Sequence, residues 1–371
     1  MRFLALLLGH LTGLAACAAP PAALAPAASI APQEEIGSLR NARVAYAMSA
    51  ERAQLTFFAG GLSNEEVAEL SVLAPNLRIV TGLTSEQALE RAAEAHGVEA
   101  RYATPEFLAR ASNLVWVQAM SAGVDRYAGN AALMQNDAIV FTNMQGVSGP
   151  AIADHVLGML LTLTRNLRFY GNEQEAGRWT PGGGGGATAL AGRTMLVVGL
   201  GGIGTEIAER AAGFGMRVIA TRRSDTPGPA FVEKVGHTED LLAMLPEADV
   251  VAIAVPLTAE TEGMFGAAAF AAMKPGAYLL NIARGKVVDT AALVAALNSG
   301  RLAGAGLDVT NPEPLPADHP LWRMSNVVIT PHVASDAELT NARSWSLLRE
   351  NLRRFAAGEP LYNVVDKRAG Y

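Results

Sequence analysis

A glycine-rich segment in the middle of the chain has the spacing that lets a backbone approach a phosphate. Residues 199–204 read GLGGIG, in the order G-x-G-x-x-G. The apolar run before them predicts a strand, and residues 205–214 predict a helix, which is the context that this motif requires. The helix amide end attracts a pyrophosphate, so the segment predicts a dinucleotide site; a glycine-rich turn without a ligand is the alternative. Its predicted binding residues are Gly199, Gly201, Gly202, Ile203 and Gly204.

The tip of the next predicted strand, residues 218–221, carries Arg222, Arg223 and Ser224. An acidic residue at this place normally binds the ribose 2′-hydroxyl of NAD. An arginine pair cannot accept that hydrogen bond, but it neutralises and holds a 2′-phosphate. The sequence therefore predicts NADP as the cofactor, with NAD as the second option. A solvated basic turn is the simpler interpretation.

Three further side chains could take part in catalysis: Arg284, Glu313 and His332. Each follows a separate apolar run by a few residues. Ligands of open α/β sheets bind outside the carboxyl ends of the strands. These three residues can therefore converge on one crevice. Taken singly, they could equally be a surface charge, a turn residue between two prolines and a buried or capped imidazole.

The elements that must position these residues form two blocks in which short apolar runs alternate with helical stretches. This alternation predicts mostly parallel sheets with helices on their faces. The predicted fold is α/β, with two doubly wound parallel-sheet domains of Rossmann-like or flavodoxin-like type and an active-site cleft between them. The predicted strands are residues 77–80, 114–117 and 138–141 in the first block and 195–198, 218–221, 250–255, 278–282, 305–309 and 327–329 in the second.

A helix with one buried side is predicted between the blocks, because apolar residues recur every three or four positions. They are Ile152, Val156, Leu160, Leu163 and Leu167. The glycine tract at 182–186 predicts a surface loop. A second long helix is predicted at about residues 336–357, ending at Gly358, and is expected to return to the first domain.

Composition excludes several classes of protein. The 371 residues include 29 Lys and Arg against 35 Asp and Glu, a formal net charge of −6, which excludes a generic basic nucleic-acid binder. Half of the residues are hydrophobic and 17% are charged, as in a folded chain. One cysteine, Cys17, leaves no internal disulfide and no cysteine-cluster metal site. No metal is expected, because four histidines show no ligand spacing: His96, His155, His237 and His319.

The amino terminus resembles an export signal. Arg2 precedes an apolar run at 3–8 and then small residues, and the run is far shorter than the about 18 residues of a spanning helix. Residues 14–17, Leu-Ala-Ala-Cys, resemble a bacterial lipobox, which would make Cys17 a lipid anchor. An ordinary signal peptide cut later, or a wrongly chosen start codon, are the alternatives. The predicted location is exported, either periplasmic or membrane-anchored, or cytoplasmic if the start is misassigned.

Several motifs together resemble the signatures of the D-isomer-specific 2-hydroxyacid dehydrogenases, and they keep the family's order. The resemblance runs from about residue 77 to the end of the chain. The motifs are SAGVD (121–125), NMQGVSGPAIADHV (143–156), NIARGKVVD (281–289), GLDVTNPEPLP (306–316), HPLW (319–322) and TPHVA (330–334).

The resemblance implies a role for each catalytic position. Arg284 would hold a 2-oxo acid by its carbonyl and carboxylate oxygens, His332 would be the general acid/base, and Glu313 would bond to the far imidazole nitrogen. Elementary chemistry agrees with these roles. A free imidazole titrates near pH 6.5, and a neighbouring carboxylate stabilises its charged form, so that it can give a proton as a ketone is reduced. A guanidinium stabilises the developing alkoxide.

The resemblance also implies binding residues. The backbone amides of Ala122, Gly123 and Val124 would receive the substrate carboxylate. Asp308 would accept a bond from the nicotinamide carboxamide. Two further cofactor-binding positions are Pro256 and Ala283. Asp289 is more simply a helix N-cap.

The function implied is NADP-dependent reduction of a small 2-oxo acid, with glyoxylate or hydroxypyruvate favoured by the Arg222 pair. Asp154, where the family usually has Glu, is a minor departure; an export signal is atypical and leaves the supply of NADPH unexplained. An exported nucleotide-sensing binding protein without turnover is the alternative.

A homodimer through the cofactor domain and the helix at 152–167 is implied. The predicted domains are a signal and Ala/Pro-rich tether (1–33), a substrate domain (41–143 plus 335–371) and an NAD(P)-binding domain (144–334).

Overall fold

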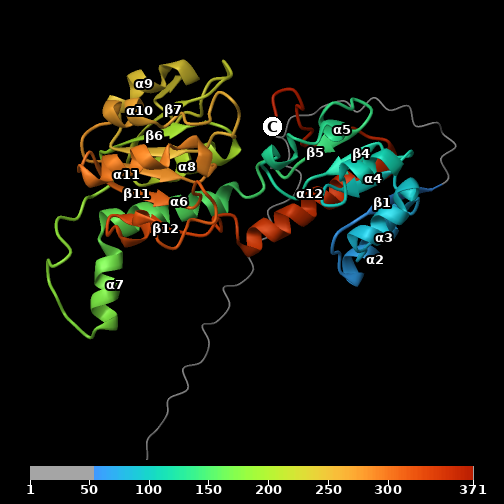
Figure 1. The fold of residues 1–371 in the computed structure, drawn as a ribbon, viewed down its shortest axis with the longest axis horizontal. Helices are drawn as coiled ribbons and strands as arrows, with labels where there is room; N and C mark the ends of the chain where they lie inside the picture. The colour runs from blue at the N-terminus through green and yellow to red at the C-terminus, as the bar shows by residue number, and fades with distance from the viewer. Residues whose placement is uncertain (1–53, 371) are drawn as a thin grey trace, which may run out of the picture. The chain divides into compact units, whose positions relative to one another are not determined.

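The computed structural model describes residues 54–370 (Figure 1). The predicted export signal, the lipobox with Cys17 and the Ala/Pro-rich tether lie outside these described residues. Within the described part, no helix combines the length and the apolar character needed to cross a bilayer.

The first half of the chain builds a five-stranded, all-parallel sheet with the strand order β2-β1-β3-β4-β5. This is the flavodoxin-like order of a doubly wound sheet. Its strands are β1 (Leu55–Phe58), β2 (Leu77–Val80), β3 (Gly97–Glu99), β4 (Trp116–Gln118) and β5 (Val140–Thr142). The connecting helices are α2 (Asn64–Leu73), α3 (Ser85–Glu90), α4 (Pro105–Arg110) and α5 (Ala131–Met134). The beginnings of α2 and α3 are stabilised by local sequence, because Ser63 and Thr84 each form a capping box with the residue three positions later.

The second half builds a seven-stranded parallel sheet with the order β12-β11-β10-β9-β6-β7-β8. Its strands are β6 (Thr194–Val198), β7 (Arg217–Thr221), β8 (Lys234–Gly236), β9 (Val250–Ile253), β10 (Ala277–Asn281), β11 (Leu302–Leu307) and β12 (Val327–Ile329). Its main helices are α8 (Gly202–Gly213), α9 (Leu241–Met244), α10 (Ala267–Ala272) and α11 (Thr290–Asn298). The prediction of two parallel-sheet α/β domains is confirmed.

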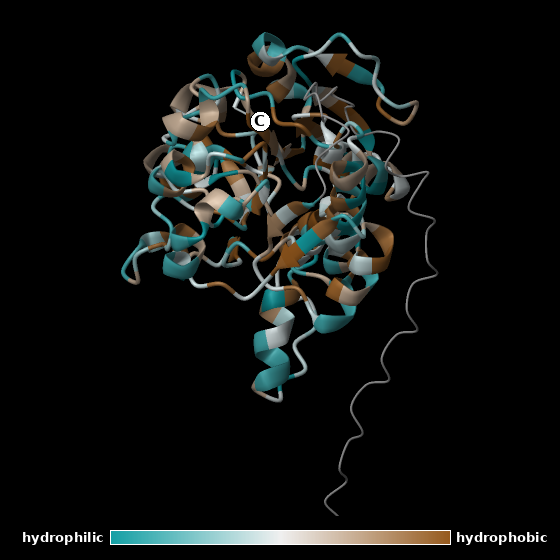
Figure 2. Cartoon of the chain, turned by 90° about the vertical axis from the view of Figure 1, so that its right-hand side faces the viewer, coloured by the Kyte–Doolittle hydropathy of each residue, from teal (hydrophilic) through white to brown (hydrophobic). Residues whose placement is uncertain are grey.

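The buried cores explain why continuous apolar runs in the sequence locate the strands. Residues 195–198 of β6 and 250–253 of β9 are all almost fully buried, and apolar residues gather on the strands inside the fold (Figure 2). Strand β8 was not predicted, because its three residues, Lys-Val-Gly, form no apolar run and lie on the sheet edge.

The predicted linking helix is two helices. α6 (Gly149–Thr164) buries Ile152, Val156 and Leu160, as the apolar spacing predicts. Asn166 then adopts a left-handed backbone with φ 56°, and α7 (Leu167–Glu175) starts in a new direction (Figure 1). The prediction that Leu167 belongs to the buried stripe is therefore wrong, and its side chain is 51% exposed. The glycine tract at 182–186 forms no helix or strand, as predicted.

The last long helix, α12 (Glu338–Ala357), ends at Gly358, whose φ of 70° is the left-handed backbone typical of a helix end. Leu352 and Phe355 on this helix pack into the core of the five-stranded sheet. The Phe355 ring lies 5.0 Å from that of Trp116 on β4. The chain therefore returns to its first sheet after completing the second.

Candidate active site

The G-x-G-x-x-G segment connects β6 to α8, as predicted. Gly199 has φ 102°, and a Cβ there would lie 2.8 Å from the backbone oxygen of Ala254. A Cβ on Gly204 would lie 2.0 Å from the backbone oxygen of Gly199. These two glycines let the turn, the helix and the loop after β9 pack closely together.

Gly201 differs, because a Cβ there would meet no atom within 4 Å. The space beside it is open, and the amino terminus of α8 has no side-chain cap. Uncapped amides at a helix start attract an anion. β6 also lies between β7 and β9, so the chain order of the sheet reverses here. Open α/β sheets bind their ligands at this switch point, and the residues present fit a dinucleotide pyrophosphate.

The arginine pair follows β7. The Arg222 Nη1 donates to the backbone oxygens of Thr226 (3.0 Å) and Pro227 (3.3 Å), and its buried Nε has no partner within the described chain. Arg223 is exposed, and Ser224 Oγ lies 3.2 Å from Thr226 Oγ1. Arg222 is therefore fixed by its own loop, beside an accessible second guanidinium.

Arg284 follows β10, and the buried Asn281 sets its backbone. The Asn281 side chain donates to the Arg284 backbone oxygen (3.0 Å) and accepts from the Ala283 amide (3.0 Å). The Arg284 Nη1 donates to the Ala283 backbone oxygen at 2.7 Å. Its Nε and Nη2 lie 3.0 and 2.9 Å from one carboxylate oxygen of Asp125.

The loop after β4 meets this guanidinium. A Cβ on Gly123 would lie only 1.8 Å from the Arg284 Nη2, so only glycine permits the approach. The loop is held in place by Asn143, which donates to the Ala122 backbone oxygen (2.8 Å), and by Ser121. The structure thus brings Arg284 together with the predicted substrate-binding residues.

Glu313 and His332 form a pair after β11 and β12. His332 Nδ1 lies 2.7 Å from Glu313 Oε1, with the two side chains 44% and 42% exposed. The bond at Nδ1 leaves Nε2 as the nitrogen available to a ligand. Arg284 and Glu313 follow neighbouring strands. The segments after those strands touch, because a Cβ on Gly285 would lie 1.8 Å from the Thr310 backbone oxygen.

His332 has a left-handed backbone, with φ 58°. Non-glycine residues adopt this conformation rarely, and surrounding bonds must offset its cost in free energy. The His332 amide donates to the Asp308 backbone oxygen at 2.8 Å. The Asp308 carboxylate accepts from the next two amides, those of Val333 (2.9 Å) and Ala334 (3.1 Å).

Asp308 is 3% exposed, and its carboxylate also accepts from Thr330 Oγ1 at 2.7 Å. Thr330 Oγ1 in turn lies 2.9 Å from His155 Nε2. In the structure, therefore, Asp308 holds the turn that carries His332. The nicotinamide contact expected for Asp308 stays a prediction. The sequence did not predict that Asp308 holds this turn or that His155 contacts Thr330, because both depend on contacts between distant segments.

Two minor predictions concern acidic residues at helices. Asp289 caps α11, accepting from the Ala292 amide at 3.0 Å, which confirms the N-cap. Asp154 on α6 pairs with Arg210 on α8 at 2.5 Å, and its side chain is 72% exposed. Within residues 54–370, no group of three or more His, Cys, Asp or Glu side chains could hold a metal ion.

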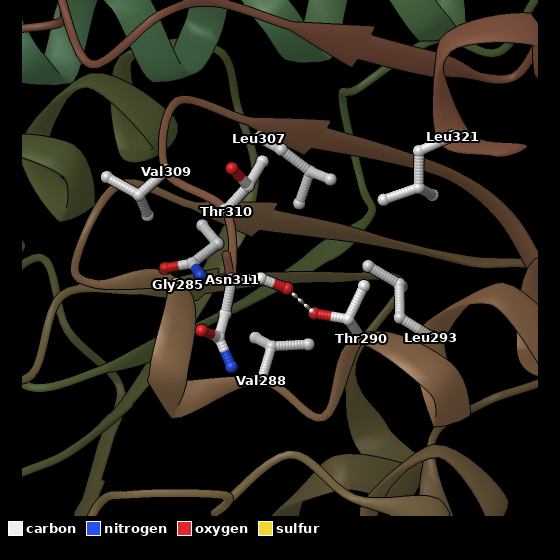
Figure 3. Close-up of a pocket in the computed structure, with 10 residues that line it drawn as sticks. Gly285, Val288, Thr290, Leu293, Leu307, Val309, Thr310, Asn311 and Leu321 are labelled. Carbon is white, nitrogen blue, oxygen red and sulfur yellow. Dashed lines mark hydrogen bonds between the residues drawn. The ribbon is translucent and has the colours of Figure 1, made fainter. Parts of the chain in front are cut away.

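A small cavity of about 10 Å³ lies beside the Arg284 segment (Figure 3). Gly285, Thr310 and Leu307 line it, and Thr290 Oγ1 donates to the Asn311 backbone oxygen at its edge (2.8 Å). A water molecule needs roughly 10–15 Å³, so this cavity is too small for an organic substrate.

The site combines a turn that fits a pyrophosphate, at the switch point of a parallel sheet, with a guanidinium and an imidazole–carboxylate pair at the same strand ends. This combination is typical of a dinucleotide-dependent oxidoreductase. Residues 157–334 match the family model described as "D-isomer specific 2-hydroxyacid dehydrogenase, NAD binding domain". The chain belongs to the D-isomer specific 2-hydroxyacid dehydrogenase family. It is an NAD(P)-dependent enzyme that transfers hydride between the cofactor and a 2-oxo acid.

Relatives with stated activities support this assignment. The chain is 39% identical over 242 residues to a glyoxylate reductase of Korarchaeum cryptofilum, covering 62% of this chain and 70% of that protein. It is 38% identical over 239 residues to glyoxylate/hydroxypyruvate reductase B of Salmonella agona, covering 62% and 72%. A D-isomer specific 2-hydroxyacid dehydrogenase from Xanthobacter autotrophicus Py2, solved with NADPH and MES, superposes with a TM-score of 0.72 at 32% identity, covering 86% and 100%.

Proposed function

We propose that the enzyme uses NADPH to reduce glyoxylate to glycolate or hydroxypyruvate to D-glycerate. The observation that carries the proposal is the 2.7 Å contact between His332 Nδ1 and Glu313. It fixes the imidazole with Nε2 available, and a general acid delivers its proton from such a positioned nitrogen. A relative in Korarchaeum cryptofilum is named for glyoxylate, and a relative in Salmonella agona is named for both substrates.

The residues divide the work. Arg284 binds the carbonyl and carboxylate oxygens of the 2-oxo acid and stabilises charge on the oxygen that becomes the alkoxide. Backbone amides of Ala122, Gly123 and Val124 receive the carboxylate. His332 delivers the proton from Nε2 to that oxygen, and Glu313 keeps the ring oriented. The reduced nicotinamide, when bound, supplies the hydride.

The cofactor is held along the carboxyl edge of the seven-stranded sheet. The α8 amides and the glycines of residues 199–204 take the pyrophosphate, and Pro256, Ala283 and Asp308 lie along the nicotinamide half. Arg222 and Arg223, with Ser224, take the 2′-phosphate. The Xanthobacter neighbour, solved with NADPH, supports this preference.

A paired substitution tests the phosphate site. Arg222→Asp with Arg223→Ala should move the ratio of kcat/KM for NADPH over NADH toward NADH by at least about 100-fold, since two charge-assisted bonds of about 1.5–3 kcal/mol each are lost. Initial rates with both cofactors measure it. An unchanged ratio would eliminate the phosphate clamp.

The division into domains is part of the proposal. Residues 41–143 with 335–371 form the substrate domain, and residues 144–334 form the cofactor domain. The packing of α12 on the five-stranded sheet supports this division. A homodimer through the cofactor domain and α6 is proposed, and sedimentation velocity of the purified enzyme tests it.

Export is proposed from the sequence of residues 1–19, and lipid anchoring at Cys17 from that of residues 14–17. Mass spectrometry of the mature amino terminus tests both. A diacylglycerol-modified Cys17 as first residue supports the anchor, whereas a methionine downstream of Cys17 as first residue supports a cytoplasmic enzyme with a different start.

The activity itself is tested by NADPH oxidation at 340 nm with glyoxylate, hydroxypyruvate, pyruvate and a bulkier 2-oxo acid. Glyoxylate and hydroxypyruvate should give the highest kcat/KM. Binding of NADPH without oxidation by any of these acids would contradict the proposal.

A further inference from the structure

We infer that Asp125 is the positioning residue of Arg284: its carboxylate occupies one edge of the guanidinium and leaves the other edge for the substrate. The inference rests on the proposed function, in which Arg284 binds the 2-oxo acid. It assigns a part in that reaction to a residue from the other sheet.

The contacts of Arg284 divide its five N–H donors. Nε and Nη2 both lie against Asp125 Oδ1, at 3.0 and 2.9 Å, and Nη1 donates to the Ala283 backbone oxygen at 2.7 Å. A guanidinium has one N–H on Nε and two on each Nη. One N–H on Nη1 and one on Nη2 are therefore left over. Because the group is planar, these two N–H groups share one edge and suit a pair of substrate oxygens.

Asp125 is itself firmly placed. It begins a short 3-10 turn, Asp125–Tyr127, and the preceding Val124 is 1% exposed. A Cβ on Gly123 would lie 1.8 Å from the Arg284 Nη2 and 2.9 Å from Asp125 Oδ1. The absence of a side chain at Gly123 is thus what allows the ion pair to form.

The ion pair joins segments that follow different sheets. Asp125 follows β4, and Arg284 follows β10, 159 positions later. The two side chains are 29% and 28% exposed, so solvent screens the pair only in part. One carboxylate therefore fixes the guanidinium relative to the loop of residues 122–124, which is proposed to bind the same substrate.

Removal of the Asp125 carboxylate should lower kcat and leave KM almost unchanged. Without Asp125, Arg284 keeps its charge and still attracts an anionic substrate, but its free edge is no longer aligned. Misplacement by about 1 Å costs on the order of 100-fold in rate. Asp125→Ala should therefore lower kcat by roughly 10- to 100-fold. KM should change by less than about threefold, since the charge that binds the anion is retained.

The conservative variant distinguishes position from charge. Asp125→Asn retains an oxygen that can accept from Nε, so its kcat should recover by about tenfold over Asp125→Ala. Glu106→Gln on α4 is the matched control, because Glu106 also pairs with an arginine, Arg110, at 2.7 Å, on a helix to which no site residue is assigned. Its kcat should equal that of the wild type. Thermal unfolding and NADPH binding, followed by fluorescence, establish that each variant is folded.

A readout without turnover completes the test. Calorimetric binding of oxalate to the NADPH-loaded enzyme should differ by less than about threefold between wild type and Asp125→Asn. A KM or oxalate Kd about tenfold lower with an unchanged kcat would show that Asp125 competes with the substrate, and would overturn the inference. Unchanged kcat and KM would also overturn it. Failure of the wild type to reduce any 2-oxo acid would instead overturn the proposed function, and oxalate binding would still test the Arg284 edge.

Discussion

At the scale of single residues, the His332–Glu313 pair is the proposed site of proton transfer. Glu313 takes Nδ1, and backbone bonds around Asp308 hold His332 in its left-handed conformation. Both features orient the ring before any substrate arrives. One defined nitrogen, Nε2, is thereby left for a ligand, as the proposed general acid requires.

Replacing this imidazole should remove the proton donor and little else. His332→Ala should lower kcat by about 10²- to 10⁴-fold, the usual contribution of a general acid. The NADPH Kd should stay within a factor of about two, because the pyrophosphate is held by the α8 amides elsewhere on the sheet edge. Steady-state kinetics and fluorescence titration measure the two quantities.

The matched variant is Glu313→Gln, which keeps an oxygen acceptor for Nδ1 but removes the charge. Its kcat should lie between those of the wild type and His332→Ala. If His332→Ala retained most of the activity, another group would have to be the acid.

At the scale of elements, the junction of β6 and α8 combines close packing with an open face. Gly204 touches the Gly199 backbone, whereas Gly201 faces empty space. We therefore expect that Gly204 is needed for folding and Gly201 for the approach of the cofactor. This difference lets the two roles be measured separately.

Gly204→Ala should reduce the free energy of unfolding by about 1–3 kcal/mol, since its methyl group would overlap the Gly199 oxygen. Gly201→Ala should leave stability within about 0.5 kcal/mol, apart from backbone effects, and should raise the NADPH Kd by at least tenfold. Urea unfolding and fluorescence titration give both values. Equal losses of stability in the two variants would contradict this division of roles.

The elements also show where reading from sequence succeeds. Buried runs such as residues 195–198 are found because every side chain in them is apolar. The break between α6 and α7 is missed, since Leu163 and Leu167 keep helical spacing across Asn166. Periodicity reports which residues are apolar, and it cannot report a single left-handed residue that redirects the chain.

Among the proposed site residues, Arg284, Glu313 and His332 were predicted from their motifs and their places after strands. Asp125 was inside a recognised motif, yet its pairing with Arg284 was not foreseen. The same holds for His155 and Asn281. Their partners come from segments brought together only by the completed fold, so no local pattern carries the information.

At the scale of the whole molecule, arginine–carboxylate pairs predict how stability depends on pH. Hydrogen bonds from Arg91 and Arg78 lower the pKa of Glu94 from 4.5 to about 2. On α12, burial alone would raise the pKa of Glu350, but hydrogen bonds from Arg353 and Arg354 outweigh it and lower the pKa.

A carboxylate whose pKa is lower in the folded state stabilises the fold above its unfolded value and loses that contribution as the pH falls. The Tm should therefore decrease steadily below pH 4.5, toward the value of about 2 for Glu94. Glu350→Gln should show a shallower decrease than the wild type. Calorimetric scans between pH 7 and about pH 3 test this, and identical slopes in the two proteins would contradict it.

The most direct test of the central claim is the product formed from hydroxypyruvate and NADPH. One D-glycerate should appear for each NADPH consumed, as measured by chiral chromatography beside absorbance at 340 nm, and His332→Ala should form almost none. L-glycerate as the product, or no glycerate from an enzyme that binds NADPH, would contradict the account.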